Sequence, residues 1–159
     1  MKFLVDRMCG RLAKWLRLLG YDASYVTQAQ KPEEIIYNSL REQRVILTRN
    51  LRISRAKGFK VYYVKSSDFF SQAKEVVGEF KLKIGEDKIF TRCIHCNGGI
   101  KKIEKREVEG LVPAYVYQTC EAFYCCKNCK KIYWKGSHLE LARKILNKIA
   151  GRDNERDFG

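Results

Sequence analysis

The sequence predicts an α/β domain with a mostly parallel sheet flanked by helices, followed by a smaller cysteine-rich module and a C-terminal helix. Apolar runs of strand length alternate with amphipathic stretches over residues 1–89, which is typical of consecutive βαβ units. From Thr91 onward cysteines occur in pairs, and another amphipathic run follows Trp134. We therefore expect segments at 1–89, 90–137 and 138–150, with residues 151–159 as a frayed tail.

Four short segments are expected to be strands. They lie at 2–5, 25–27, 45–48 and 60–64, and each is a short, mainly apolar or β-branched run. Runs of this kind are typical of strands that are buried in a parallel sheet. The carboxyl ends of such strands form the edge at which parallel sheets bind their ligands.

Four helices are expected to follow these strands in turn. They lie at 8–19, from Pro32 onward, at 51–57 and at 69–80. The first helix separates apolar from basic side chains, as a helix on the surface of a core does. Its apolar face carries Leu12, Trp15, Leu16 and Leu19, and its basic face carries Arg7, Arg11 and Lys14.

The second helix has clear start signals. Proline suits the first turn because its missing N–H is not needed there, and Glu33 and Glu34 lie near the positive end of the helix dipole. Its buried stripe is expected to consist of Ile35, Ile36 and Leu40.

Polar residues follow two of the expected strands directly. Asp6 comes after the strand at 2–5, and Asn50 lies just beyond the strand at 45–48, while Glu42 lies on the helix that leads into the latter strand. The position of Asp6 suits either a metal ligand or an N-cap of the first helix, and both roles stay open at this point.

The chain is basic along its whole length. Its 159 residues include 32 Lys and Arg against 18 Asp and Glu, a formal net charge of +14. Residues 1–89 hold 18 basic and 10 acidic groups, and residues 90–159 hold 14 and 8. A positive field over both parts favours a polyanionic partner, most often nucleic acid. A generally high content of charged residues, as in heat-stable proteins, does not explain an excess of one sign.

The composition and the start of the chain exclude several classes of protein. No apolar stretch reaches the roughly 20 residues of a membrane helix, and Asp6 and Arg7 interrupt the start where a secretory signal needs apolar residues. With 45% hydrophobic residues, the chain is neither disordered nor collagen-like. We expect a soluble, cytoplasmic protein without membrane contacts.

Four of the seven cysteines form two C-x-x-C pairs, Cys93 with Cys96 and Cys126 with Cys129. Each pair can form a turn in which two thiolates face one cation, and two such turns complete the tetrahedron of structural zinc. This spacing favours zinc over two idle thiol pairs, and neither pair has the strand-to-helix context of a redox site. Because four thiolates leave no position for water, the module is expected to be structural.

The other side chains of the cysteine-rich module are not assigned to the metal site. Cys125 in place of Cys126 gives a C-x-x-x-C spacing that suits the turn less well, so Cys125, Cys120 and Cys9 are left without a role. His95 is expected to face solvent or RNA. The aromatic residues are expected to form mainly the core of the module rather than to stack on bases. They are Tyr115, Tyr117, Phe123, Tyr124, Tyr133 and Trp134.

Four sequence blocks form a combination that is more specific than any one of them. They are FLVDRMCGRLAKWLRLLGYDASYV, REQRVILTRNLRI, RCIHCNGGI and FYCCKNCKKIYWKGSH, and they extend from Phe3 to His138. In this order they resemble the Mut-7 C-terminal ribonuclease domain family, whose members combine a PIN-like nuclease fold with a zinc ribbon. The resemblance implies this fold and structural Zn²⁺ at the two cysteine pairs.

The same resemblance implies an acidic catalytic site. PIN-like nucleases cleave RNA with Mg²⁺ or Mn²⁺ held by several carboxylates, because hard cations must activate a water and stabilise the leaving oxygen. Asp6 matches the first acid of the family and Glu42 matches the acid on the helix. Asn50 stands where the family's L-T-R-D block has aspartate, and an uncharged amide oxygen is a weaker ligand. Asp22 and Asp68 have no equivalent in the motif and are expected in turn or cap roles.

Two functions follow from these observations. The first is RNA binding with weak or lost nuclease activity, on a large structured RNA such as ribosomal RNA or a ribosomal subunit. The second is an active Mg²⁺- or Mn²⁺-dependent endoribonuclease that cleaves single-stranded RNA. The missing carboxylate and the positive charge favour the first, whereas the family favours the second. No small-molecule substrate is expected, and DNA binding is disfavoured because no recognition helix is expected between the cysteine pairs.

Basic side chains of three regions are expected to contact RNA phosphates. These regions are the first helix, the segment around Asn50 and the cysteine-rich module. The residues are Arg7, Arg11, Lys14, Arg49, Arg52, Lys101, Lys102, Lys105, Arg106, Lys127, Lys130 and Lys131.

Overall fold

The computed structural model describes residues 1–27, 29–85, 87–134, 136, 144, 147 and 149. The chain divides into two compact units, Met1–Asn97 and Gly98–Gly159. The helix expected at 138–150 and the tail at 151–159 lie outside the continuous described segments and stay predictions. Among the described residues, no helix combines the length and the apolar character that a membrane span requires.

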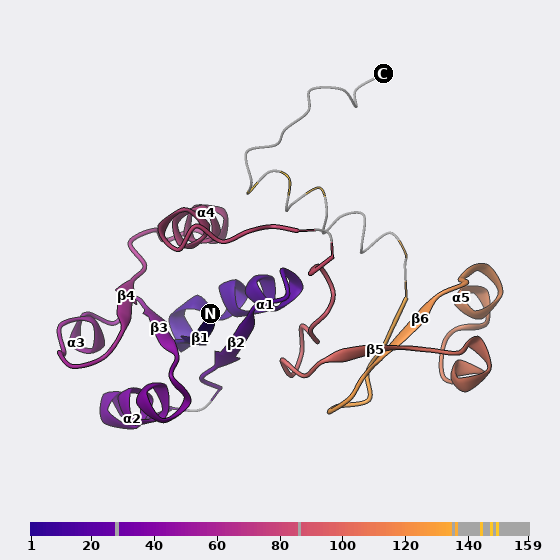
Figure 1. Cartoon of the computed structure of the whole chain (residues 1–159), viewed down its shortest axis with the longest axis horizontal. Coiled ribbons are helices and arrows are strands. Elements are labelled where there is room, and N and C mark those ends of the chain that lie inside the picture. The colour runs from indigo at the N-terminus through magenta and orange to yellow at the C-terminus, as the bar shows by residue number, and fades with distance from the viewer. Residues whose placement is uncertain are drawn as a thin grey trace, which may run out of the picture. The chain divides into compact units, whose positions relative to one another are not determined.

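A parallel four-stranded sheet forms the centre of the first unit (Figure 1). Its strands are β1 (Lys2–Val5), β2 (Asp22–Tyr25), β3 (Val45–Thr48) and β4 (Val61–Tyr63), in the order β2-β1-β3-β4. All three pairings are parallel, which confirms the predicted fold class. The strand expected at 25–27 begins earlier, at Asp22. As an edge strand with one neighbour, β2 does not need the apolar run on which the prediction relied.

Helices cover both faces of this sheet (Figure 1). A short 3₁₀ turn, η1 (Arg7–Cys9), leads into α1 (Gly10–Leu18), which lies with α4 (Phe69–Glu79) on one face. Helices α2 (Pro32–Glu42) and α3 (Leu51–Ser54) lie on the other face, and α3 is shorter than the expected 51–57. Asp68 caps α4 by accepting a hydrogen bond from the N–H of Ser71, as expected of a cap residue.

Alternate residues of the strands point to opposite faces, so each face has its own core. Leu4 and Ile46 pack with Ile35 of α2 and Ile53 of α3. Phe3 points the other way, and its ring meets that of Phe80 edge-on at 5.4 Å. The sheet is thus held from both sides.

The prediction that Leu40 is buried was wrong, because its side chain is 54% exposed. The inward position on this turn of α2 belongs to Ser39, which is 1% exposed. Its hydroxyl donates to the carbonyl oxygen of Arg44 at 2.7 Å. A buried serine with a satisfied hydroxyl is not recognisable from an apolar pattern.

The second unit contains a three-stranded antiparallel sheet. Strands β5 (Ile100–Ile103), β6 (Phe123–Cys126) and β7 (Ile132–Trp134) are arranged in chain order. A 3₁₀ turn, η2 (Lys105–Val108), and a short helix, α5 (Ala114–Thr119), connect β5 to β6. The sequence analysis expected no recognition helix between the cysteine pairs. With six residues and no basic side chain, α5 does not resemble a helix that reads DNA.

The aromatic residues of the second unit are divided between core and surface. Phe123 is fully buried, and Tyr117, Tyr124 and Tyr133 are half-buried. Tyr115 is 75% exposed and Trp134 is 36% exposed. The expectation of a mainly internal role is correct for Phe123 and wrong for Tyr115.

An ion-pair cluster closes the amino edge of the parallel sheet. Nη1 of Arg44 donates to Oδ1 of Asp22 at 2.6 Å and to the carbonyl oxygen of Phe3 at 3.2 Å. Burial raises the pKa of Asp22, but the hydrogen bonds from Arg44 and Asn97 outweigh it and hold the pKa below its usual value. Asp22 therefore stabilises the fold in its charged form.

Replacing the charged Asp22 side chain should lower the free energy of unfolding by an amount that depends on pH. We expect Asp22→Asn to lower the free energy of unfolding by about 2 kcal/mol near neutral pH, as for other hydrogen bonds to charged groups. Because the pKa of Asp22 is lower in the folded state, its contribution is present above about pH 4 and is lost as the pH falls through the folded pKa. Urea unfolding at several pH values measures the difference between the two proteins, which should shrink below pH 4.

Asp68→Asn is the matched control, since asparagine caps a helix about as well as aspartate. It should leave the unfolding free energy close to that of the wild type. A constant difference between wild type and Asp22→Asn at every pH would contradict this account of Asp22.

Candidate functional site

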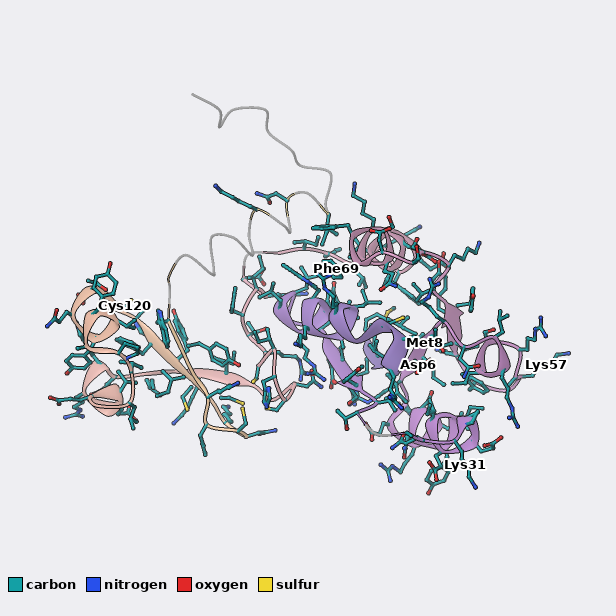
Figure 2. The ribbon with its side chains drawn as sticks, turned by 180° about the vertical axis from the view of Figure 1, so that it is seen from behind. Asp6, Met8, Lys31, Lys57, Phe69 and Cys120 are labelled. Carbon is teal, nitrogen blue, oxygen red and sulfur yellow. The ribbon has the colours of Figure 1, made fainter. Side chains whose placement is uncertain are left out.

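The carboxyl ends of β1 and β3 lie side by side at the switch point of the sheet, where the order in which the chain adds strands reverses. From β1 the chain adds β2 on one side, then crosses to β3 on the other side, and α1 and α2 consequently lie on opposite faces (Figure 1). Parallel sheets bind ligands at such a switch point. Asp6 follows β1 here, before Met8 and the start of α1 (Figure 2). Asn50 follows β3 at the same edge.

The hydroxyl of Thr48 brings Asp6 and Asn50 together. It donates to Oδ2 of Asp6 at 2.6 Å and accepts the backbone N–H of Asn50 at 2.9 Å. Asp6 is 7% exposed and Thr48 is fully buried. Asp6 occupies the N-cap position of η1, but its side chain makes no capping hydrogen bond. Of the two roles left open by the sequence, capping by the Asp6 side chain is therefore not observed.

Asn50 has a structural role of its own. Its Oδ1 accepts the N–H of Arg52 at 2.9 Å and so caps α3. An aspartate in this position would make the same bond and would add a charge at the start of the helix. The asparagine therefore keeps the fold of the loop while reducing the charge at the edge.

Glu42 lies away from this edge, contrary to the expectation from the motif. It ends α2, and its Oε2 accepts Nε of Arg44 at 2.6 Å, while Oε1 accepts Nη2 of Arg41 at 3.2 Å. Since Arg44 also binds Phe3 and Asp22, at the starts of β1 and β2, Glu42 belongs to the amino edge. A four-residue strand separates the two edges by about 13 Å. Glu42 and Asp6 therefore cannot hold one metal ion in this arrangement.

Glu75 binds the loop after β4 at the carboxyl edge of the sheet but was not recognised in the sequence. From α4 it accepts the N–H of Lys65 at 2.8 Å, the N–H of Ser66 at 3.0 Å and the hydroxyl of Tyr62 at 3.1 Å. Burial raises the pKa of Glu75, but the two backbone N–H groups and the hydroxyls outweigh it and lower the pKa. Its carboxylate fastens the loop after β4, and no motif marks such a role.

Two further carboxylates of α2 also have partners. Glu34 accepts the backbone N–H of Lys31 at 3.1 Å as part of a capping box. Glu33 lies 3.7 Å from Nη2 of Arg52, with both side chains exposed. Neither contact brings a carboxylate to Asp6.

Cys9 is buried, and its thiol is expected to stay protonated at neutral pH. Burial and then the negative charge of Asp6 raise the pKa of this thiol to about 11, against the opposing charge of Arg49. A protonated thiol is neither a nucleophile nor a metal ligand at neutral pH. This agrees with leaving Cys9 without a role.

Most of the basic residues predicted to bind RNA are exposed. Arg49 is an exception, because its Nη1 donates to the carbonyl oxygens of Val64, Lys65 and Ser66 and so clamps the loop after β4. Lys105 is half-buried, 3.8 Å from Glu121, and Nε of Arg106 lies 2.6 Å from Glu104. The exposed members are Arg7, Arg11, Lys14, Arg52, Lys101, Lys102, Arg106, Lys127, Lys130 and Lys131.

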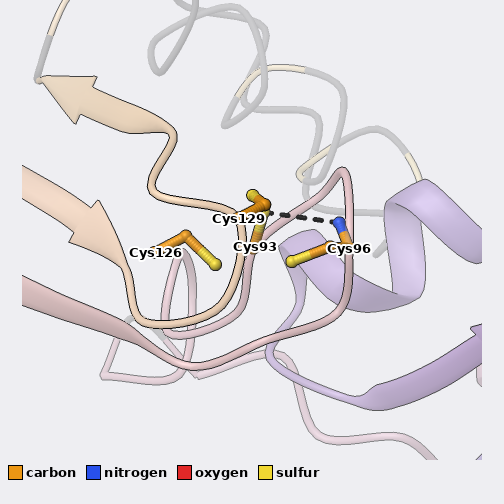
Figure 3. Close-up of side chains that lie close together, drawn as sticks. All are labelled: Cys93, Cys96, Cys126 and Cys129. Carbon is orange, nitrogen blue, oxygen red and sulfur yellow. Dashed lines mark hydrogen bonds between the residues drawn. The ribbon is translucent and has the colours of Figure 1, made fainter.

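The four cysteines of the two C-x-x-C pairs form one cluster (Figure 3). The sulfur atoms of Cys93, Cys96, Cys126 and Cys129 all lie within 4.8 Å of one another. In a tetrahedral site with Zn–S bonds of about 2.3 Å, the sulfurs are about 3.8 Å apart. Donor type and spacing therefore fit zinc. Cys125 is not part of the cluster.

The two cysteine pairs have the same local geometry. The residue after the second cysteine of each pair has a positive φ, 67° at Asn97 and 61° at Lys130. Its N–H donates to the carbonyl oxygen of the first cysteine of the pair, Cys93 or Cys126. One further N–H, of Cys96 or of Asn128, points at the sulfur of the first cysteine at 3.4 Å. Such N–H···S contacts are typical of turns that present thiolates to a metal. His95 is exposed, as expected.

The cap role of Asn50 gives a testable difference between two substitutions. Asn50→Asp keeps the acceptor and places a charge at a helix start, so its unfolding free energy should equal that of the wild type or exceed it by up to about 1 kcal/mol. Asn50→Ala removes the acceptor and should lose about 1 kcal/mol. Thermal unfolding of the three proteins measures this order, and equal stability of wild type and Asn50→Ala would show that the cap is unimportant.

The comparisons with known proteins agree with the resemblance seen in the sequence. No curated protein and no solved structure matches the chain significantly. The family model described as the Mut7-C RNAse domain matches residues 1–146. The chain therefore belongs to the Mut7-C RNAse domain family.

Proposed function

We propose that this protein binds large structured RNA, such as ribosomal RNA, through a ribonuclease-derived fold whose cleavage activity is weak or lost. The observation that carries the proposal is the charge at the carboxyl edge. Of the three residues that the family motif assigns to catalysis, Asp6 alone brings a carboxylate to this edge, because Asn50 is an amide and Glu42 pairs with Arg44 at the other edge.

The chemistry of two-metal cleavage explains why the number of carboxylates at this edge matters. Two divalent cations a few ångströms apart carry four positive charges, and carboxylates must offset most of them. Asp6 supplies one negative charge. The carboxylate oxygens of Glu75 already accept hydrogen bonds from Tyr62, Lys65 and Ser66. Mg²⁺ or Mn²⁺ binding strong enough for catalysis is therefore not expected.

The basic surface supports retention of RNA binding. Arg7, Arg11 and Lys14 are exposed on η1 and α1, next to the edge that holds Asp6. On the second unit Lys101 and Lys102 are exposed on β5. Phosphate contacts of this kind give affinity without sequence preference, which suits a stable structural partner.

An active Mg²⁺- or Mn²⁺-dependent endoribonuclease is the second candidate. Membership of a ribonuclease family supports it. The bond between Thr48 and Asp6 would orient the carboxylate in such an enzyme too.

Cleavage of a labelled, partly single-stranded RNA separates the two candidates. With Mn²⁺ or Mg²⁺ present, we expect the wild type to bind the RNA without cutting it, and Asp6→Asn to bind it within about twofold of the wild type, because no phosphate contact is removed. Cleavage by the wild type that disappears in Asp6→Asn would establish the enzyme instead. Cleavage by Asn50→Asp alone would support loss of activity through this position.

The salt dependence of RNA affinity tests the contribution of β5. Replacing Lys101 and Lys102 together by glutamine should reduce the magnitude of the slope of log affinity against log salt by about 1.4, since each phosphate contact on a single strand contributes about 0.7. Lys105 and Arg106, replaced in the same way, are the matched control, because both already lie beside glutamates. An unchanged slope in the first pair would place the RNA elsewhere on the protein.

A further inference from the structure

A buried arginine of the α/β unit donates hydrogen bonds to the backbone between the two cysteines of the first pair. Arg17, on α1, is 7% exposed. Its Nη1 donates to the carbonyl oxygens of Ile94 at 3.1 Å and His95 at 2.8 Å, and its Nε donates to that of Ala23 at 2.7 Å. Ile94 and His95 are the two residues between Cys93 and Cys96, so one guanidinium fixes the backbone of the whole turn.

Asn97 holds the same turn from its other end. Its Oδ1 accepts the N–H of Ala23 at 3.1 Å, and its Nδ2 donates to Oδ1 of Asp22 at 2.7 Å. Its own carbonyl accepts Nη1 of Arg92 at 2.9 Å. Ala23 lies on the edge strand β2, whose outer N–H and carbonyl need partners. Asn97 and Arg17 provide both, so the turn is fastened to the sheet by bonds that do not involve a metal.

The charge of Arg17 suits its surroundings. A zinc ion with four thiolates carries a net charge of about −2, which favours a buried cation nearby. Burial lowers the pKa of Arg17, and the negative charges of Cys93 and Cys96 oppose this. A buried guanidinium is costly unless it is hydrogen-bonded and lies near negative charge, and Arg17 meets both conditions.

We infer that Arg17 is a positioning residue for the zinc centre: with Asn97 it holds Cys93 and Cys96 in their metal-binding geometry before zinc arrives, and it offsets the charge of the thiolates. Zinc then organises only the second cysteine pair. The inference concerns the metal centre and is independent of the proposed RNA binding.

Zinc affinity of the full chain tests the inference. We expect Arg17→Met to weaken zinc binding about 10- to 100-fold, as loss of groups that orient metal ligands does elsewhere. Arg17→Lys keeps the charge but not the fork of donors, and should give an intermediate loss. The measurement is competition with a chromophoric chelator, with circular dichroism to show that the α/β unit is folded.

Arg49→Met is the matched control for a purely structural effect. Arg49 also donates hydrogen bonds to three backbone carbonyl oxygens of the first unit, at the loop after β4. Its replacement should lower stability but leave zinc affinity within about twofold, since it touches neither cysteine pair. Unchanged zinc affinity in a folded Arg17→Met protein would overturn the inference.

Hydrogen exchange in the wild type gives a test that does not depend on any variant folding. The N–H of Asn97 and the N–H of Lys130 make equivalent bonds, to the carbonyls of Cys93 and Cys126. After removal of zinc with a chelator, the Lys130 amide should exchange at least about tenfold faster, while the Asn97 amide should change little. Equal loss of protection at both amides would mean that zinc itself shapes the first turn.

Discussion

The hydroxyl of Thr48 is the contact on which the candidate site depends. It is fully buried and joins the side chain that follows β1 to the backbone that follows β3. Because these strands are neighbours at the switch point of the sheet, one short hydrogen-bond chain sets both the orientation of Asp6 and the start of the loop that Asn50 caps. The two loops that follow these strands are thereby held together at one edge of the sheet.

The two edges of the parallel sheet have different electrostatic roles. At the amino edge Arg44 pairs with both Asp22 and Glu42, and this cluster reaches Asn97 beside the first cysteine pair. At the carboxyl edge the buried Asp6 is followed by η1 and α1, whose basic residues Arg7, Arg11 and Lys14 are exposed. The acids Asp22, Glu42 and Glu75 thus pair with groups that hold the fold together. This distribution favours binding of a polyanion over binding of a cation pair.

Much of the fold and part of the candidate site could be predicted from the sequence, and the residues that were misplaced or missed have identifiable causes. The parallel sheet followed from apolar runs such as Val45–Thr48, and the four-cysteine cluster followed from two C-x-x-C pairs. Glu42 was misplaced because closeness to β3 in the chain does not say at which end of the strand a side chain lies. Glu75 and Arg17 were missed because they act on backbone groups that are distant in the sequence. Such contacts leave no periodic or motif signal.

Binding of Mn²⁺ at the carboxyl edge tests the central claim, that this edge lacks the charge to hold a catalytic metal. Paramagnetic broadening of amide NMR signals would be followed during titration of the zinc-loaded protein, with the amides of Asp6, Thr48 and Asn50 as reporters and those near Glu42 as controls. The account predicts no saturable broadening at the reporters up to about millimolar Mn²⁺ in the wild type, and stronger broadening in Asn50→Asp. Saturable broadening of the wild-type reporters at micromolar Mn²⁺ would contradict it.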